Sequence, residues 1–431
     1  MHLSKGLNSE SIISVATRVV GMGCAFIQVR YAIQGVGVTA FGAWVAMYSW
    51  ASLMVFLDVG VGYAMQNAAS RLSAQHRKCT SLWFETAFVF SASAACLAML
   101  VLVCAAKFAL SRVYLHKLGG LMTNEEWLFD CAVIAIVAGV LIVPSSIVMK
   151  YACAIKRVSL TNWATMVVNV ALSSAIVWAA ATKVVSVKLY AALLGSQQVL
   201  PGVVVAVVLA CSGEIRWIPR SFSRRRLRAL VPQGLAFVPA ATAAMAMVNV
   251  PQILAAYIGG ASGAALWNTA FRLSNAVLGV QQGFLQPLWP AFTRARALGE
   301  VEWVRAAYAR AVRWSIVAFG LPLLLLPLWG PFVLKMWVGD AVEPTNAFMV
   351  VFGLYAMFQA FIQPAAVLLN SAGRPLRQGI VGTVCIVLIT MTVAVLAGFG
   401  SVNVVAIACM CWFGLLTVPV VWFEARSIIA E

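Results

Sequence analysis

The chain has 431 residues, of which 63% are hydrophobic and only 10% are charged. Soluble globular proteins carry about 25% charged residues, so a water-soluble fold is excluded by the amount of apolar surface it would have to cover. The formal net charge of +17 does not indicate a nucleic-acid partner, because the basic residues lie in short segments between apolar runs. Cytoplasmic loops of membrane proteins collect Lys and Arg in this way.

Apolar runs long enough to cross a bilayer recur along the whole chain. A spanning helix needs about 20 mostly apolar residues, and about twelve segments meet this length. In the first half the predicted spans are Ser11–Ile33, Thr39–Met65, Ser81–Ala106, Trp127–Met149, Asn162–Ala181 and Leu189–Cys211. In the second half they are Leu230–Ile258, Ala264–Trp289, Trp314–Leu334, Thr345–Leu369, Ile380–Phe399 and Val402–Trp422. The sequence therefore predicts an all-α polytopic membrane protein, because a helix satisfies its own backbone in lipid.

The basic residues predict the orientation of the chain. With a cytoplasmic N-terminus, most of the 30 Lys and Arg residues fall in cytoplasmic segments, so both termini are expected in the cytoplasm. The segment Arg216–Arg228 mixes arginines with Trp, Ile, Phe and Leu. It predicts a basic amphipathic linker on the cytoplasmic membrane surface, held by anionic lipid headgroups. A binding site for a cytoplasmic partner is the alternative.

The two halves of the chain resemble each other. Residues 43–71 align with residues 266–294 at an offset of 223, which pairs Trp44 with Trp267 and places a glycine and an arginine at matching positions. A similar match at an offset of 220 recurs near the fourth and tenth predicted spans. An even number of helices per half gives parallel repeats, a recurring design of transporters with the substrate site between the halves.

This repeat predicts three parts of the chain. Residues 1–215 form an N-terminal six-helix lobe, residues 216–229 form the basic linker, and residues 230–431 form a C-terminal six-helix lobe. Several prolines, among them Pro144 and Pro364, fall within or at the ends of spans. Proline removes a backbone donor and kinks a helix, so these positions are candidate hinges, although membrane helices tolerate proline in general.

Three arginines lie within predicted spans. A charge at the bilayer centre costs at least about 2.5 kcal/mol and usually faces a cavity or a partner. Arg272 lies roughly 13 Å into its helix at about 1.5 Å per residue, too deep to reach the interface easily. It predicts a cavity cation for an anionic substrate, with a buried ion pair as the alternative. Arg18 and Arg30 lie nearer the two ends of the first span, where interfacial anchoring competes with a substrate role.

Two acidic residues and several neutral polar residues complete the candidate site. Asp58 and Glu85 are the candidates for ion coupling, with a structural ion pair as the alternative for Asp58 and interfacial solvation for Glu85. Among the amides and aromatics, Asn249, Gln281 and Trp267 are candidate substrate contacts, because sugars present hydroxyl edges and apolar faces. Single amides are also ordinary contacts between membrane helices.

Metal and cofactor chemistry finds no support in the sequence. Nearly all of the ten cysteines fall inside apolar runs without zinc spacing, where they act as small buried hydrophobes. The three histidines, His2, His76 and His116, lie far apart in polar segments. No metal, no cofactor and no catalytic constellation are therefore expected.

Arg18 in the first span and two longer segments carry a family resemblance. The segment Gly42–Arg71 contains the core Leu-Asp-Val-Gly-Val-Gly, and Trp267–Arg294 ends in Pro-Leu-Trp-Pro-Ala-Phe-Thr-Arg. With the pattern of about twelve short-looped spans over the whole chain, the sequence resembles the polysaccharide flippases of the multidrug/oligosaccharidyl-lipid/polysaccharide exporter superfamily.

The resemblance implies two six-helix lobes around a cationic cavity in the bacterial inner membrane. It implies that an undecaprenyl-diphosphate-linked oligosaccharide repeat unit is flipped from the cytoplasmic to the periplasmic leaflet by alternating access. Arg18 and Arg272 would then contact the diphosphate or acidic sugars. Membrane lipids and a polysaccharide polymerase complex are the implied partners, and nucleic acid is not one.

Three other functions compete with this interpretation. A cation-coupled multidrug or metabolite antiporter of the same superfamily is the nearest, but it would be expected to rely on intramembrane acids, and the spans offer only Asp58 and Glu85 against three arginines. A membrane enzyme of polysaccharide assembly would need a large external loop with catalytic residues, and the longest external loop, near Leu110–Glu126, has no such constellation. A scaffold or channel has the least support.

Overall fold

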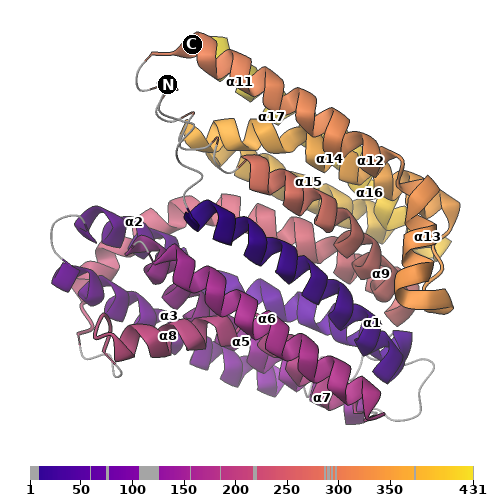
Figure 1. The fold of residues 1–431 in the computed structure, drawn as a ribbon, viewed down its shortest axis with the longest axis horizontal. Coiled ribbons are helices and arrows are strands. Elements are labelled where there is room, and N and C mark those ends of the chain that lie inside the picture. The colour runs from indigo at the N-terminus through magenta and orange to yellow at the C-terminus, as the bar shows by residue number, and fades with distance from the viewer. Residues whose placement is uncertain are drawn as a thin grey trace. The chain divides into compact units, whose positions relative to one another are not determined.

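The computed structural model describes nearly the whole chain. The described residues are 9–58, 60–73, 77–105, 126–155, 157–184, 186–216, 221–285, 299–372 and 375–430, with residues 288, 292, 295 and 296. All secondary structure within these ranges is helical (Figure 1). The chain divides into two compact units, Met1–Val238 and Pro239–Glu431.

The helices have the length and composition of membrane spans. Eight helices among the described residues are long and apolar enough to cross a membrane, and ten are if each of two bent pairs is one span. Two of the eight, in α1 (Ser9–Ser52) and α9 (Arg224–Leu285), are each interrupted by a glycine with non-helical backbone angles, so each comprises two helices. The predicted all-α fold with about twelve spans is confirmed, and the chain is a multi-pass membrane protein.

The first unit is built from α1 and the helices that follow, together with the start of α9. After α1 come a 3-10 turn Leu53–Asp58, α2 (Val61–Ser73), α3 (Arg77–Ala105), α5 (Glu126–Ala154), α6 (Val158–Ala181), α7 (Val187–Ser196) and α8 (Leu200–Cys211). The pair α7 and α8 is bent by 49°. Small residues let the backbones approach: a Cβ on Gly139 of α5 would lie 2.4 Å from the carbonyl oxygen of Ala51.

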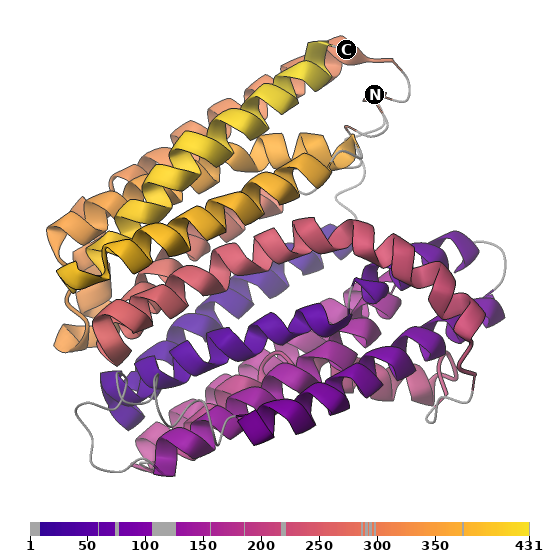
Figure 2. The ribbon, with the colours of Figure 1, turned by 180° about the vertical axis from the view of Figure 1, so that it is seen from behind.

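The second unit contains the rest of α9 and the helices that follow (Figures 1 and 2). These are α11 (Val301–Trp314), a π-helical segment Ser315–Gly320, α12 (Leu321–Leu324), α13 (Leu326–Val338), α14 (Asn346–Ser371), α15 (Pro375–Val395), α16 (Asn403–Trp412), a π-helical segment Phe413–Thr417 and α17 (Val418–Ala430). The span from α11 to α13 bends by 64° near Leu325, beside Pro322 and Pro327. Each proline removes a backbone donor, which accounts for the bend.

The backbone carries the repeat that the sequence suggests. The break in α1 is at Gly37 (φ 83°) and the break in α9 is at Gly260 (φ 63°), an offset of 223 residues. Both glycines adopt a positive φ that other residues rarely tolerate, so each marks the point where one helix ends and the next begins. Trp44 and Trp267, seven residues after these glycines, are both buried.

An ion pair recurs in the two units. In the first unit Arg157, at the start of α6, donates a hydrogen bond to Glu214, which follows α8. In the second unit Arg377, near the start of α15, lies 3.9 Å from Glu424 of α17. In each unit, therefore, a base just before the fifth predicted span of its half lies near an acid just after the sixth.

The segment predicted as a linker belongs largely to the first unit. Residues 217–220 lie outside the described residues, but α9 already begins at Arg224, and Leu230 is fully buried in the core of that unit. Close to this point the α9 backbone abuts the break in the second span, because a Cβ on Gly60 would lie 2.3 Å from the carbonyl oxygen of Gly234. The boundary between the units therefore falls inside α9, after Val238, rather than within residues 216–229.

Several predicted spans have different bounds in the structure, and the second and the ninth differ in how they begin or are interrupted. The second span, predicted as continuous, is interrupted by the 3-10 turn Leu53–Asp58 and by the positive φ of Gly60. The ninth span, predicted to begin at Trp314, is continuous with α11 from Val301. The arginines of α11 therefore lie on a helix and not in a loop. A helix at the membrane edge tolerates them, because an arginine stem can cover apolar surface while its charge reaches water.

Candidate functional site

Arg272 is held by two buried amides of α9. Its Nε donates a hydrogen bond of 3.0 Å to Oδ1 of Asn268, one helical turn earlier on the same face. The Asn268 amide nitrogen donates in turn to Oε1 of Gln252, at 3.3 Å. Gln252 precedes the break at Gly260 and Asn268 follows it, so the chain of hydrogen bonds joins the two helices of α9.

These amides orient the guanidinium of Arg272 and add no negative charge to its surroundings. Asn268 is 8% exposed and Gln252 is 5% exposed, and Arg272 itself is partly buried. Arginine can only donate, so it must face the oxygen of the Asn268 amide, and the amide nitrogen then faces Gln252. The orientation of the Asn268 amide is therefore fixed. Positive charges positioned in this way inside a membrane protein are characteristic of substrate paths.

The other predicted substrate contacts of the second unit lie apart from this network. Trp267 is 1% exposed and its ring lies edge-on to Phe352, with a centroid distance of 5.1 Å, so its placement favours a packing role. Asn249 donates to the carbonyl oxygen of Met245, one turn back on its own helix. Gln281 is fully buried and donates at 2.6 Å to the carbonyl oxygen of Ala360, which ties α9 to α14.

The two arginines of the first span belong to the first unit. The backbone of Arg18 is part of α1, but its side chain lies outside the described residues. Arg30, on the same helix, is exposed. A substrate role for Arg18 and Arg30 therefore stays a prediction from the sequence.

A second amide network, in the first unit, was not predicted. Gln28 of α1 is fully buried and donates at 3.1 Å to Oγ of Ser173 on α6. On the same helix Asn169 accepts a hydrogen bond of 3.0 Å from Gln197, which follows α7. The available signal was an amide within an apolar run, and buried amides are hydrogen-bonded in nearly every case.

Asp58, one of the two coupling candidates, is buried and lies in an ion pair. It is 4% exposed, and its Oδ2 lies 3.1 Å from Nζ of Lys150 on α5. Its Oδ1 accepts a hydrogen bond of 2.8 Å from the backbone of Gly60, across the break in the second span. Lys150 also lies 4.1 Å from the centre of the Tyr63 ring. The predicted alternative for Asp58, a structural ion pair, fits this geometry, and its base is Lys150, one residue beyond the predicted span Trp127–Met149.

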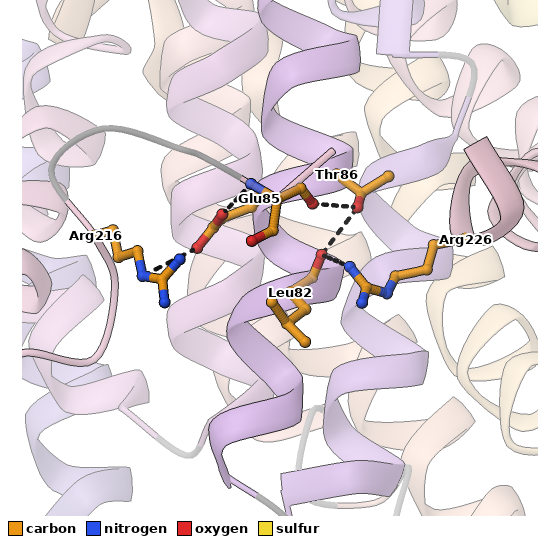
Figure 3. A network of polar contacts seen from close by, with 6 residues as sticks. Leu82, Glu85, Thr86, Arg216 and Arg226 are labelled. Atoms are coloured by element: carbon orange, nitrogen blue, oxygen red, sulfur yellow. Dashed lines mark hydrogen bonds and ion pairs between the residues drawn. The ribbon is translucent and has the colours of Figure 1, made fainter. Parts of the chain in front are cut away.

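Glu85 is the centre of a polar cluster on α3 (Figure 3). It is 1% exposed, and its Oε2 accepts a hydrogen bond of 2.8 Å from the backbone nitrogen of Ser221. Its Oε1 lies 4.0 Å from Nε of Arg216. On the preceding turn, Arg226 donates at 3.2 Å to the carbonyl oxygen of Leu82. Glu85 therefore fastens the chain between α8 and α9 to the first unit.

Three or more metal-binding side chains do not gather at any point in the part of the chain that the structure describes. The ionisable groups that the sequence singled out divide instead by sign. Asp58 and Glu85 of the first unit are matched with bases and backbone donors of that unit, whereas Arg272 of the second unit is oriented by neutral amides.

The chain is similar to known proteins in fold and not in sequence. No protein-family model and no curated protein matches the sequence. A multidrug resistance MATE family transporter of the MOP superfamily, solved in an inward-facing conformation, superposes with a TM-score of 0.73 at 15% identity, covering 97% of this chain and 98% of that one. The chain has the fold of the MATE transporters.

Two further structures agree with this fold. A mutant of the MATE transporter VcmN of Vibrio cholerae gives a TM-score of 0.64 at 14% identity, covering 98% of this chain and 95% of that one. A MOP superfamily transporter from Pyrococcus furiosus, described as having a binding pocket of reverse polarity, gives 0.59 at 16% identity with the same coverage. At such identities the likeness shows the fold alone.

Proposed function

We propose that the protein is a membrane transporter that works by alternating access and carries a substrate with an anionic group. The substrate that fits best is an oligosaccharide repeat unit linked to undecaprenyl diphosphate, moved from the cytoplasmic to the periplasmic leaflet of the bacterial inner membrane. The fold shared with MATE transporters supports transport, and the family resemblance of the sequence supports the lipid-linked sugar. The asymmetry of basic residues supports cytoplasmic termini.

The single observation that carries the proposal is the hydrogen-bonded Arg272. A charge inside the membrane is costly and usually faces a cavity or a partner, and the hydrogen bonds through Asn268 to Gln252 fix the orientation of this guanidinium. An arginine fork is well matched to phosphate oxygens, which it binds by two parallel hydrogen bonds. A diphosphate is the chemical group that such a residue would recognise.

A cation-coupled multidrug antiporter is the second candidate, because the solved structures of this fold include multidrug resistance transporters. That function would be expected to use an acid free to exchange a cation. The two acids that the sequence proposed for coupling, Asp58 and Glu85, each already have a partner: Lys150 for Asp58, and the Ser221 backbone with Arg216 for Glu85. Their placement therefore favours the anionic substrate.

The test is a deletion of the gene in a bacterium that makes the surface polysaccharide, followed by measurement of which leaflet holds the lipid-linked repeat units. Build-up on the cytoplasmic leaflet, relieved by the wild-type protein and by Arg313→Ala but not by Arg272→Ala, is expected. Arg313 is the matched control, because it is an exposed arginine of the same unit. Arg272→Lys keeps the charge without the fork and should restore transport only in part.

Two results would redirect the proposal. Normal surface polysaccharide together with altered sensitivity to cationic compounds would favour the multidrug antiporter. Repeat units that reach the periplasmic leaflet but stay unpolymerised would favour an enzyme of polysaccharide assembly, or a role in a complex with the polymerase that we propose as a partner.

A further inference from the structure

The second unit contains a cavity of about 520 Å³ between the end of α9 and α11 with its π-helical continuation. Its wall is formed mainly by aromatic and small apolar side chains. Arg310 is the one charged residue that the described part of the chain contributes to the lining. The volume falls within the range of about 300–1,000 Å³ that is usual for small-molecule sites.

The hollow follows from the sequence of α11. Lining residues recur at spacings of three and four along α11 and the π-helical segment that continues it, so they share one face. Three of them, Ala307, Ala311 and Ala318, are alanines, which leave room between the helices. The π-helical segment begins at Ser315, within the cavity wall, and such segments are frequent at functional sites.

Aromatic pairs lie toward both ends of the hollow. Phe284 of α9 and Phe319 of the π-helical segment have ring centroids 6.2 Å apart. Toward the start of α11, Trp303 lies edge-on to Phe292 at the same distance. Phe284 is 69% exposed and Trp314, in the same wall, is 67% exposed. The cavity therefore opens to the surroundings past aromatic side chains, which an apolar chain can enter.

The charge of α11 indicates what kind of apolar molecule fits. Arg310 is exposed in the cavity wall, and Arg305 and Arg313 lie on the same helix, with Glu302 as the acid of its first turn. Basic residues near a membrane surface attract anionic lipid headgroups. Tryptophans such as Trp303 are also typical of the interface between lipid and water.

The wall offers two neutral polar side chains, Gln281 and Ser315, which are too few to favour a sugar ligand. Gln281 lines the cavity, but its amide nitrogen is used by Ala360, and its Oε1, although without a hydrogen-bond partner among the described residues, is shielded from solvent. A sugar would need several hydrogen bonds for its hydroxyls, and the wall offers mostly apolar carbon. An acyl chain needs none.

We propose that this cavity holds one acyl chain of an anionic phospholipid from the surrounding leaflet, with the lipid phosphate at Arg310. The site is distinct from the Arg272 network, since Gln281 lies nine residues, or roughly 13 Å along an ideal helix, beyond Arg272. It is also independent of the proposed transport activity. A lipid bound only to the folded protein stabilises it, and filling this gap with a chain restores contacts that α9 and α11 would otherwise lack.

The experiment measures lipid retained by the purified full-length protein. The protein is taken from nanodiscs of equal parts phosphatidylglycerol and phosphatidylcholine with identical chains, and bound lipids are counted by native mass spectrometry. One retained phosphatidylglycerol is expected for the wild type. Arg310→Ala should reduce the preference for the anionic lipid roughly fivefold, the equivalent of about 1 kcal/mol per basic residue. Arg313→Ala, on the same helix but outside the cavity lining, should reduce the preference clearly less than Arg310→Ala does.

Two further variants separate the charge from the cavity. Arg310→Lys keeps the positive charge and should retain phosphatidylglycerol. Ala311→Phe fills the cavity and should retain neither phosphatidylglycerol nor phosphatidylcholine. Because Ala311→Phe can also misfold, the role of the charge is decided by comparing Arg310→Ala with Arg310→Lys. Equal retention of both lipids by the wild type, or an unchanged preference in Arg310→Ala, would overturn the proposal.

A competition experiment identifies the source of the chain. Displacement of the bound lipid by an equimolar polyprenyl phosphate, with no recovery of phosphatidylglycerol, would overturn the phospholipid assignment in favour of a site for the substrate's tail. Retention of phosphatidylglycerol under the same conditions supports it. The experiment measures bound lipid and not transport. Failure of the lipid site therefore leaves the proposed transport function standing, and failure of the transport function leaves the lipid site standing.

Discussion

Removing the amine of Lys150 isolates the buried carboxylate of Asp58. The two side chains are 15% and 6% exposed, with 3.1 Å between Nζ and Oδ2, so solvent screens the pair only weakly. Breaking a buried pair by removing one partner costs about 3–5 kcal/mol, because the remaining charge stays unpaired in the interior. Lys150→Met keeps the length of the side chain and should cost that amount, seen as a lower unfolding temperature of the purified protein.

The reverse change should be milder. Asp58→Asn keeps an oxygen that can accept from Gly60, and the remaining ammonium still faces the ring of Tyr63. We therefore expect a loss of about 1–2 kcal/mol, close to that of one hydrogen bond to a charged group. The double variant should lose clearly less than the sum of the single losses, as a double-mutant cycle shows for residues in contact.

The same variants test the function of Asp58. If it serves only the structure, Asp58→Asn should transport in proportion to the folded protein that reaches the membrane. Additive losses in the cycle would refute the buried pair. Full folding of Asp58→Asn with no transport would refute the structural assignment and restore Asp58 as a coupling residue.

Three other variants test other parts of the fold. Gly260→Ala should cost about 1–2 kcal/mol, because alanine is strained at a φ of 63°, and the loss should appear in thermal unfolding while the helical content from circular dichroism is kept. Glu85→Leu removes the acceptor of the Ser221 backbone and should make the chain before α9 easier to cleave by trypsin, whereas Glu85→Gln keeps an acceptor and should be cleaved more slowly. Trp267→Ala should lose about 3–5 kcal/mol with no specific loss of substrate affinity, since the ring packs on Phe352; a substrate defect in a stable protein would contradict the packing role.

The spans and the duplicated plan followed from the sequence, because both depend on local composition. Each run of about 20 apolar residues must be a helix in lipid regardless of its neighbours. The repeat at an offset of 223 also reappears in the backbone, where the breaks at Gly37 and Gly260 stand in the same register. A glycine at a helix break is an intrinsic backbone preference, so it needs no tertiary information.

The partners of the polar residues depended on the tertiary structure. A helix that is apolar on every side gives no periodic pattern to show which face meets protein and which meets lipid. Lys150 is 92 residues from Asp58, and Ser221 is 136 residues from Glu85, so neither pair could be read from spacing. The contact of Asn268 with Arg272 follows from helical spacing alone, but its link to Gln252 requires the turn at Gly260.

Residue type also proved a weaker guide than position for the aromatic residues. Trp267 has the chemistry of a sugar platform, yet it is buried, while Trp314, predicted only as the start of a span, lies exposed beside a cavity. The sequence by itself determined how many helices cross the membrane and that they come in two similar sets, since the hydrophobic effect acts on each segment separately. Only the packing of helix against helix decided which polar and charged side chains meet, since those contacts depend on distances of a few ångströms between residues far apart in the chain.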